Sequence, residues 1–185
     1  MSKGKLFVFS GASGVGKSTV LGRVMDTRKD LVFSVSATTR EPRQGEVDGK
    51  SYYFITRPQF EQWIAQGEFL EYDEHNDVLY GTPAGQVDEK LEHGNVVLDV
   101  DPNGAFNVRK LRPDTTLIFI MPPSWEELER RLRSRGDTSP EQIEKRLARA
   151  KWEMEQSPHY DYVVTNDQVE TCAAEILKII ADKAD

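Results

Sequence analysis

Residues 11–18 read Gly-Ala-Ser-Gly-Val-Gly-Lys-Ser, which fits the pattern G-x-x-x-x-G-K-[ST] in full. Only Ser10 separates this octapeptide from the apolar run Leu6–Phe9, and a helical pattern begins at about Lys17. Where a strand turns through such a loop into a helix, backbone N–H groups and the helix dipole can cradle phosphates. The sequence therefore predicts an α/β protein that binds ATP or GTP with Mg²⁺.

The side chains of this loop have distinct expected roles. Lys17 is expected to reach the β- and γ-phosphates, and the Ser18 hydroxyl is expected to ligate Mg²⁺. A glycine-rich turn without a ligand would explain neither Lys17 nor the full spacing. The residues expected to contact the nucleotide here are Gly11, Ala12, Ser13, Gly14, Val15, Gly16, Lys17, Ser18 and Thr19.

Apolar runs and helical patterns alternate along the rest of the chain. Two helix starts read as capping boxes, Ser124 with Glu127 and Ser139 with Gln142. Alternation of this kind favours a parallel sheet with helices on both faces. The expected strands are Leu6–Phe9, Asn95–Val100, Thr116–Met121 and Tyr162–Thr165, and the expected helices follow Gly16, Ser124, Ser139 and Thr165, with a weaker helix near Ala105–Leu111.

The stretch from about Ala37 to Tyr80 breaks this alternation. It is rich in Gly, Arg, Tyr and Glu, with short candidate strands at 51–55 and 69–73 and a short helix at about 58–66. We expect a subdomain inserted into the α/β core, and such insertions usually carry specificity.

Two carboxylates stand at the end of the run Val96–Asp101. Asp99 and Asp101 are separated by one residue, so both are expected to point to the same side at the carboxyl end of the strand, which is the ligand edge of an open α/β sheet. Asp99 would hold Mg²⁺ through water, and Asp101 would face a substrate. The alternative, a calcium loop starting at Asp99, fails because its twelfth position is Lys110 instead of Glu.

Net charge, the length of the apolar runs and the cysteine count exclude several classes of partner and location. The net charge of −7 argues against a nucleic-acid polymer or an anionic membrane as partner. The apolar runs are too short for a membrane span or a signal peptide, and a single cysteine agrees with a reducing compartment. We therefore expect a soluble, cytoplasmic protein. Residues 1–60 nevertheless hold 10 basic and 5 acidic side chains, and residues 130–151 hold 8 and 3, so phosphate-binding segments are locally positive.

A second set of phosphate ligands stands in the expected insertion. Arg40 and Arg43 lie close together on one loop, and guanidinium forks suit phosphate oxygens. The hydroxyls of Tyr52 and Tyr80 could add donors. Exposed, solvated arginines are the alternative interpretation of this loop. A hydrolase that cleaves a nucleoside triphosphate needs one phosphate-binding site, whereas a kinase needs two that face each other. A second set of phosphate ligands therefore favours a kinase.

Several motifs resemble, in order and spacing, those of guanylate kinases: Ser34–Gly49, Glu68–Tyr72, Tyr80–Pro83, Leu98–Asp101 and Pro122–Ser124. The resemblance runs from the phosphate loop to Asp167. It implies a P-loop nucleoside monophosphate kinase-like α/β fold and the reaction ATP + GMP → ADP + GDP in purine nucleotide metabolism. It further implies a single domain over 1–185, with a core of 1–36, 83–129 and 157–185, a nucleotide-binding insertion at 37–82 and a helical lid at 130–156.

The resemblance also implies residue roles. The acceptor phosphate would be bound by Arg40, Arg43, Tyr52 and Tyr80, and the guanine by Ser36, Glu71, Thr82 and Asp101. In the lid, Arg135 and Arg146 would close over ATP, and Arg131 would join them. Asn166 would contact adenine. Transfer itself would be carried by Lys17, Arg40, Arg135 and Arg146.

The chemistry of Glu71 agrees with this assignment independently. Guanine presents N1–H and N2–H₂ as neighbouring donors, which one carboxylate can accept together, whereas adenine presents an acceptor at N1. GMP and dGMP are therefore the expected acceptors. Two alternatives remain at this point: a guanylate-kinase-like interaction module without catalysis, and a kinase for another nucleoside monophosphate. The sequence does not predict the oligomeric state.

Overall fold

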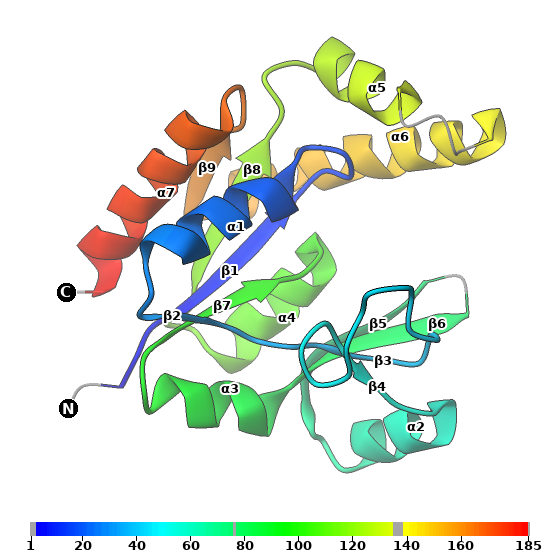
Figure 1. Ribbon diagram of the computed structural model, residues 1–185, viewed down its shortest axis with the longest axis vertical. Coiled ribbons are helices and arrows are strands. Elements are labelled where there is room, and N and C mark those ends of the chain that lie inside the picture. The colour runs from blue at the N-terminus through cyan, green and yellow to red at the C-terminus, as the bar shows by residue number, and fades with distance from the viewer. Residues whose placement is uncertain (1–2, 76, 135–138, 185) are drawn as a thin grey trace.

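The computed structural model describes residues 3–75, 77–134 and 139–184. The strands among these residues form two sheets (Figure 1). Within these residues the larger sheet has five strands in the order β2-β7-β1-β8-β9, all paired in parallel. The parallel α/β sheet expected from the sequence is confirmed. Its strands are β1 (Leu6–Gly11), β2 (Leu31–Phe33), β7 (Asn95–Asp99), β8 (Thr116–Met121) and β9 (Tyr162–Thr165).

Helices cover both faces of this sheet. Alternate residues of β1 enter different apolar clusters, because successive side chains of a strand point to opposite faces. Phe7 and Phe9 pack on the face of α1 (Lys17–Thr27) and α7 (Val169–Ala184). Leu6 and Val8 pack on the face of α3 (Ala84–Leu91) and α4 (Pro102–Leu111). The continuous apolar run of β1 is thereby buried on both sides.

The stretch in which we expect an insertion forms a second sheet. Its described strands run in the order β4-β3-β6-β5, and helix α2 (Arg57–Ala65) packs Phe60 against Phe69 with ring centroids 4.4 Å apart. The expected strand at 51–55 is shorter than predicted, and the expected helix begins one residue earlier. The strands are β3 (Ala37–Thr38), β4 (Tyr53–Phe54), β5 (Phe69–His75) and β6 (Val78–Pro83).

Strand β6 was not predicted from the sequence. It pairs antiparallel with β5, although Gly81 and Pro83 weaken its strand pattern. The glycine is required by packing, because a Cβ at Gly81 would lie 2.8 Å from the ring of Phe69 and 2.9 Å from that of Phe60. Tertiary contacts therefore decide the conformation of this segment.

The segment expected to form the lid, 130–156, includes the end of helix α5 (Trp125–Arg133) and all of helix α6 (Pro140–Glu155). At α6 the capping box of Ser139 and Gln142 is confirmed. At α5 the predicted box is wrong in one half: Ser124 accepts from the Glu127 N–H, but the Glu127 carboxylate accepts from the side chains of Arg130 and Arg131. The two helices and Ala12 of the phosphate loop share one apolar cluster.

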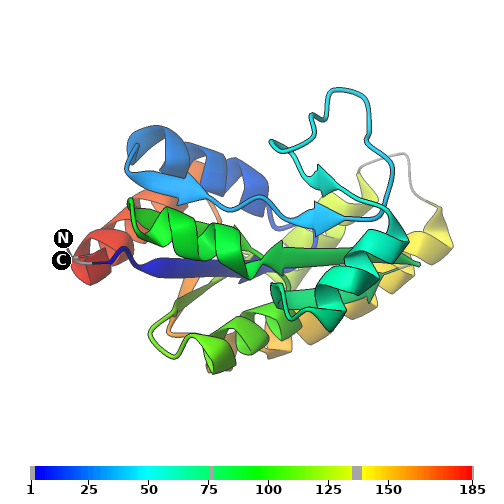
Figure 2. The same cartoon turned by 90° about the horizontal axis from the view of Figure 1, so that it is seen from below.

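The insertion and the lid lie at the same end of the molecule, away from both termini (Figure 2). This end is the carboxyl edge of the parallel strands, where ligands bind in open α/β sheets. No helix among the described residues is long and apolar enough to cross a membrane.

Candidate active site

The phosphate loop joins β1 to α1 in the conformation that its glycines allow. Gly14 and Gly16 have φ values of 85° and 88°, in the left-handed region that favours glycine. A Cβ at Gly14 would also lie 2.8 Å from the side chain of Leu132. Gly16 is the N-cap of α1, so the N-terminus of this helix faces the loop. The local geometry is thus that of a phosphate cradle.

Three residues from distant segments hold the loop in place. Glu153 accepts the Ser13 N–H at 3.1 Å. The carbonyl of Val15 accepts from Asn166 Nδ2 at 2.8 Å and from Arg131 Nη1 at 3.3 Å. Asn166 is buried, and its Oδ1 has no hydrogen-bond partner among the described residues. The structure therefore places Asn166 and Arg131 against the phosphate loop, and it adds Glu153, which sequence reasoning missed.

Lys17 forms an ion pair with Asp99, where the adjacent strands β1 and β7 end. Both side chains are partly buried, with 19% and 28% of their surface exposed. The described residues contain no group of three or more His, Cys, Asp or Glu side chains that could hold a metal ion. Ser18 and Asp99 do supply oxygen donors beside the loop, which suits Mg²⁺ bound mainly by nucleotide phosphates.

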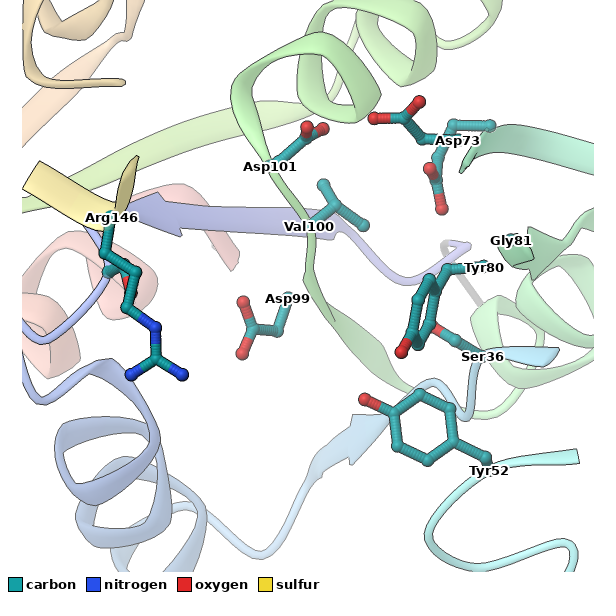
Figure 3. Close-up of a pocket in the computed structure, with 11 residues that line it drawn as sticks. Ser36, Tyr52, Asp73, Tyr80, Gly81, Asp99, Val100, Asp101 and Arg146 are labelled. Carbon is teal, nitrogen blue, oxygen red and sulfur yellow. The ribbon is translucent and has the colours of Figure 1, made fainter. Parts of the chain in front are cut away.

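A cavity of about 550 Å³ opens between the core, the insertion and the lid. In the view of Figure 3, Asp99 lies between Arg146 on one side and the rings of Tyr80 and Tyr52 on the other. Sequence reasoning found eight of the residues around it and missed Asp73, Gly81 and Val100. The lining residues are Ser13, Ser36, Tyr52, Glu71, Asp73, Tyr80, Gly81, Asp99, Val100, Asp101 and Arg146.

Glu71 and Thr82 form a buried polar pair at one end of this cavity. They face each other across β5 and β6, and the Thr82 hydroxyl donates to the Glu71 carboxylate. The pKa of Glu71 is raised to about 7, chiefly by burial and also by the charges of Asp101 and Asp73, while the hydrogen bond from the Thr82 hydroxyl opposes the shift. Gly104 of α4 leaves room for the Glu71 carboxylate, since a Cβ there would lie 2.9 Å from Oε2.

Asp101 lines the cavity with Asp99, as expected, but it does not belong to the strand. Strand β7 ends at Asp99, and Asp101 is the N-cap of α4, its Oδ1 accepting the Gly104 N–H at 2.8 Å. For this reason α4 begins at Pro102, three residues before the expected start. Asp101 Oδ2 accepts from Arg149 Nη2 at 2.9 Å.

Arg40 is fixed within the insertion. Its guanidinium donates to both oxygens of Glu46, at 2.6 and 2.7 Å, and it lies 5.0 Å from the ring centroid of Tyr52. The Arg40 guanidinium holds the pKa of Glu46 down at about 2, with help from the Arg43 N–H. The Arg43 residue is otherwise exposed. Glu46 was missed, although a carboxylate on a loop with two arginines was a usable signal.

The arginines expected in the lid differ in what the structure shows of them. Arg146 lines the cavity, whereas Arg135 lies outside the described residues. Arg149 contacts both Asp101 and Glu153, and sequence reasoning gave it no site role.

Comparisons with known proteins agree with this geometry. The family model described as guanylate kinase matches residues 3–183. The chain belongs to the guanylate kinase family. It is 49% identical over 179 residues to a guanylate kinase of Thermus thermophilus, covering 96% of this chain and 81% of the relative. It is 45% identical over 181 residues to the guanylate kinase of Rubrobacter xylanophilus, with coverages of 97% and 95%.

A solved structure supports the same family. The guanylate kinase of Anaplasma phagocytophilum superposes with a TM-score of 0.80 at 33% identity, covering 100% of this chain and 88% of that chain. The parallel α/β fold of a P-loop nucleoside monophosphate kinase is therefore the fold of this protein.

Proposed function

We propose that this protein transfers the γ-phosphoryl group of ATP to GMP and releases ADP and GDP. One observation carries the proposal: a single cavity joins Ser13 of the phosphate loop to the buried carboxylate of Glu71. A donor nucleotide on the loop and a guanine at Glu71 would then face each other across the same space. The relatives that share this sequence over most of its length are named guanylate kinases.

The base end of the cavity fits guanine better than adenine. An ionised Glu71 accepts two neighbouring hydrogen bonds, from N1–H and N2–H₂, while Thr82 holds the carboxylate in place. Adenine would leave the buried carboxylate facing an acceptor, which is strongly unfavourable in a desolvated site. Ser36 and Asp101 complete the proposed base site, supported by their position around the cavity.

We assign the phosphate group of GMP to the part of the cavity beside Tyr52 and Tyr80. Tyr52 and Tyr80 line the cavity with ring centroids 6.1 Å apart, and Arg40 packs over Tyr52. Because Glu46 and Tyr52 constrain the Arg40 guanidinium, little side-chain entropy remains to be lost when a phosphate binds. Arg43 belongs to this proposed set on the resemblance alone.

In the transfer step, a phosphate oxygen of GMP attacks the γ-phosphorus of ATP, and the bond to the β–γ bridging oxygen breaks. The acceptor oxygen carries no proton when the phosphate is a dianion, so the protein needs no general base. Its task is alignment and stabilisation of negative charge on the transferred group. We assign this role to Lys17, Arg40, Arg146 and Arg135.

Mg²⁺ fits beside the loop as part of this site. Ser18 would ligate it directly and Asp99 through water, and it would neutralise charge on the β- and γ-phosphates. In this structure Asp99 pairs with Lys17. Asn166 supports the loop through Val15, and we assign it a second role in contacting adenine.

Several further assignments belong to the same proposal. We place the insertion at 37–82 and the lid at 130–156. We include dGMP among the acceptors, because none of the proposed contacts to the base involves the ribose hydroxyls. The single cysteine agrees with work in a reducing compartment such as the cytoplasm. The negative net charge argues against a nucleic-acid polymer or an anionic membrane as partner.

The two alternatives are less well supported. An interaction module has no need of Lys17, of the glycine conformations at Gly14 and Gly16, or of a cation such as Arg146 in the cavity. A kinase for another acceptor would have no use for a buried carboxylate paired with Thr82.

The direct test is an ADP-release assay with ATP and Mg²⁺ in which GMP, dGMP, AMP, UMP and dTMP are offered separately. We expect turnover with GMP, with GDP identified by ion-exchange chromatography, and far less with AMP, UMP and dTMP. The Lys17→Met variant, purified in the same way, controls for a contaminating kinase. Equal turnover with GMP and the non-guanine acceptors would refute the proposal.

A further inference from the structure

Helix α6 places Arg149 and Glu153 one turn apart beside the active-site cavity. Glu153 is almost fully buried, with 7% of its side chain exposed. Its Oε2 accepts the Ser13 N–H at 3.1 Å, and its Oε1 accepts from Arg149 Nε at 3.1 Å. The buried carboxylate is thus compensated from two directions, by the phosphate loop and by the guanidinium.

The same guanidinium reaches the base end of the cavity. Arg149 Nη2 donates to Asp101 Oδ2 at 2.9 Å, while the Gly104 N–H holds Oδ1 of that carboxylate at 2.8 Å. Asp101 is therefore fixed on one side by its own helix, α4, and on the other by the lid helix. These two contacts, one to each carboxylate oxygen, orient the Asp101 side chain.

The chemistry of the contact requires arginine. Arg149 uses Nε for one carboxylate and Nη2 for another, so its planar fork bridges Glu153 and Asp101 in a fixed geometry. A lysine at this position would supply the charge but not two donors in fixed directions. Asp101 is only 17% exposed, and it shares the cavity with Glu71, Asp73 and Asp99, so a cation in contact with it offsets an accumulation of negative charge.

We propose that Arg149 is a positioning residue for guanine recognition, which holds the Asp101 carboxylate from the lid helix and ties it through Glu153 to Ser13 of the phosphate loop. The inference rests on the proposed function, in which Asp101 contacts guanine. The role of Arg149 in this proposal runs through its contacts to Asp101 and Glu153. Its effect is on the affinity for GMP, because a mobile Asp101 loses part of a charge-assisted hydrogen bond to the base.

The test compares Arg149→Gln, Arg149→Lys and the wild type in steady-state assays with GMP and ATP varied separately. Arg149→Gln should raise the KM for GMP about fivefold, with kcat and the KM for ATP within about twofold. Arg149→Lys should recover part of the loss. Lys145→Gln is the matched control, since it removes one cation from the same helix at a side chain that is 75% exposed, and it should behave as the wild type.

A second arm separates positioning from a general effect on folding. In the Asp101→Asn background, which keeps an N-cap side chain for α4, Arg149→Gln should change the KM for GMP by less than about twofold, because the carboxylate that Arg149 orients at the base end is already neutral. An equal KM for GMP in Arg149→Gln and the wild type would overturn the inference. So would the same fivefold rise in the Asp101→Asn background. If the wild type itself does not phosphorylate GMP, the proposed function fails, and the inference fails with it.

Discussion

The buried carboxylate of Glu71 should make the free protein less stable at high pH. Its pKa in the folded protein is about 7, against an ordinary value of 4.5, chiefly because burial disfavours the charged form. A carboxyl group with a raised pKa binds its proton more tightly in the folded state, so stability is fullest below about pH 4.5 and is lost as the pH rises through 7. At about 1.4 kcal/mol per pKa unit, the difference corresponds to roughly 3 kcal/mol.

Glu71→Gln removes this ionisation and keeps an acceptor for the Thr82 hydroxyl. At pH 8 the variant should therefore have a free energy of unfolding about 1 to 3 kcal/mol above that of the wild type. At pH 5, where Glu71 is largely protonated, the two proteins should differ by less than about 1 kcal/mol. The variant should also lose most of its preference for GMP, because the amide presents a donor where guanine donates.

Urea unfolding at pH 5 and pH 8 measures the difference, and Glu68→Gln serves as the control because that residue is exposed in the same subdomain. The control should shift little at either pH. The wild type should also gain up to about tenfold in kcat/KM for GMP between pH 6 and pH 8, as Glu71 ionises. If Glu71→Gln is no more stable than the wild type at pH 8, the ionised Glu71 carboxylate does not destabilise the folded protein as proposed.

Three other substitutions or treatments test separate parts of the account. Lys17→Met should lower kcat at least about 100-fold in steady-state assays. Its free energy of unfolding, measured by thermal unfolding, should change by less than about 1 kcal/mol. A kcat near that of the wild type would exclude the proposed role of Lys17 in phosphoryl transfer. Glu46→Gln should raise the KM for GMP about fivefold and leave that for ATP unchanged, because Arg40 loses its charged partner; an unchanged KM for GMP would show that Arg40 needs no such support. Cys172 is fully buried and its pKa is raised to about 11 by burial, so iodoacetamide at pH 8 should label it at least about 100-fold faster in urea than in the folded protein; rapid labelling of the folded protein would contradict this burial.

Local patterns predicted the parts of the fold that depend on neighbours in sequence. The run Leu6–Phe9, the loop to Ser18 and the helix from Lys17 were found because strand burial, glycine conformation and helix initiation are encoded within a few residues. The helix after Thr165, which is α7 in the structure, was found for the same reason. The resemblance placed Glu71 and Thr82 together, and their pairing across β5 and β6 agrees with it.

The remaining features depend on contacts between distant residues. Strand β6 contains a glycine that only the rings of Phe60 and Phe69 explain. Arg149 and Asp101 are 48 positions apart, and Ser13 and Glu153 are 140 apart, so no spacing rule joins them. At Ser124 the capping pattern was present, but stronger ion pairs drew the Glu127 carboxylate away. Such competition is decided by tertiary structure.

The central claim is that a buried carboxylate reads the hydrogen-bond donors of guanine. Its most direct test is the ratio of kcat/KM among GMP, IMP and AMP at pH 8 with saturating ATP and Mg²⁺. IMP keeps N1–H but lacks the 2-amino group, so the account predicts a value about 10- to 100-fold below that for GMP, with AMP lower still. Comparable values for GMP and AMP would contradict it.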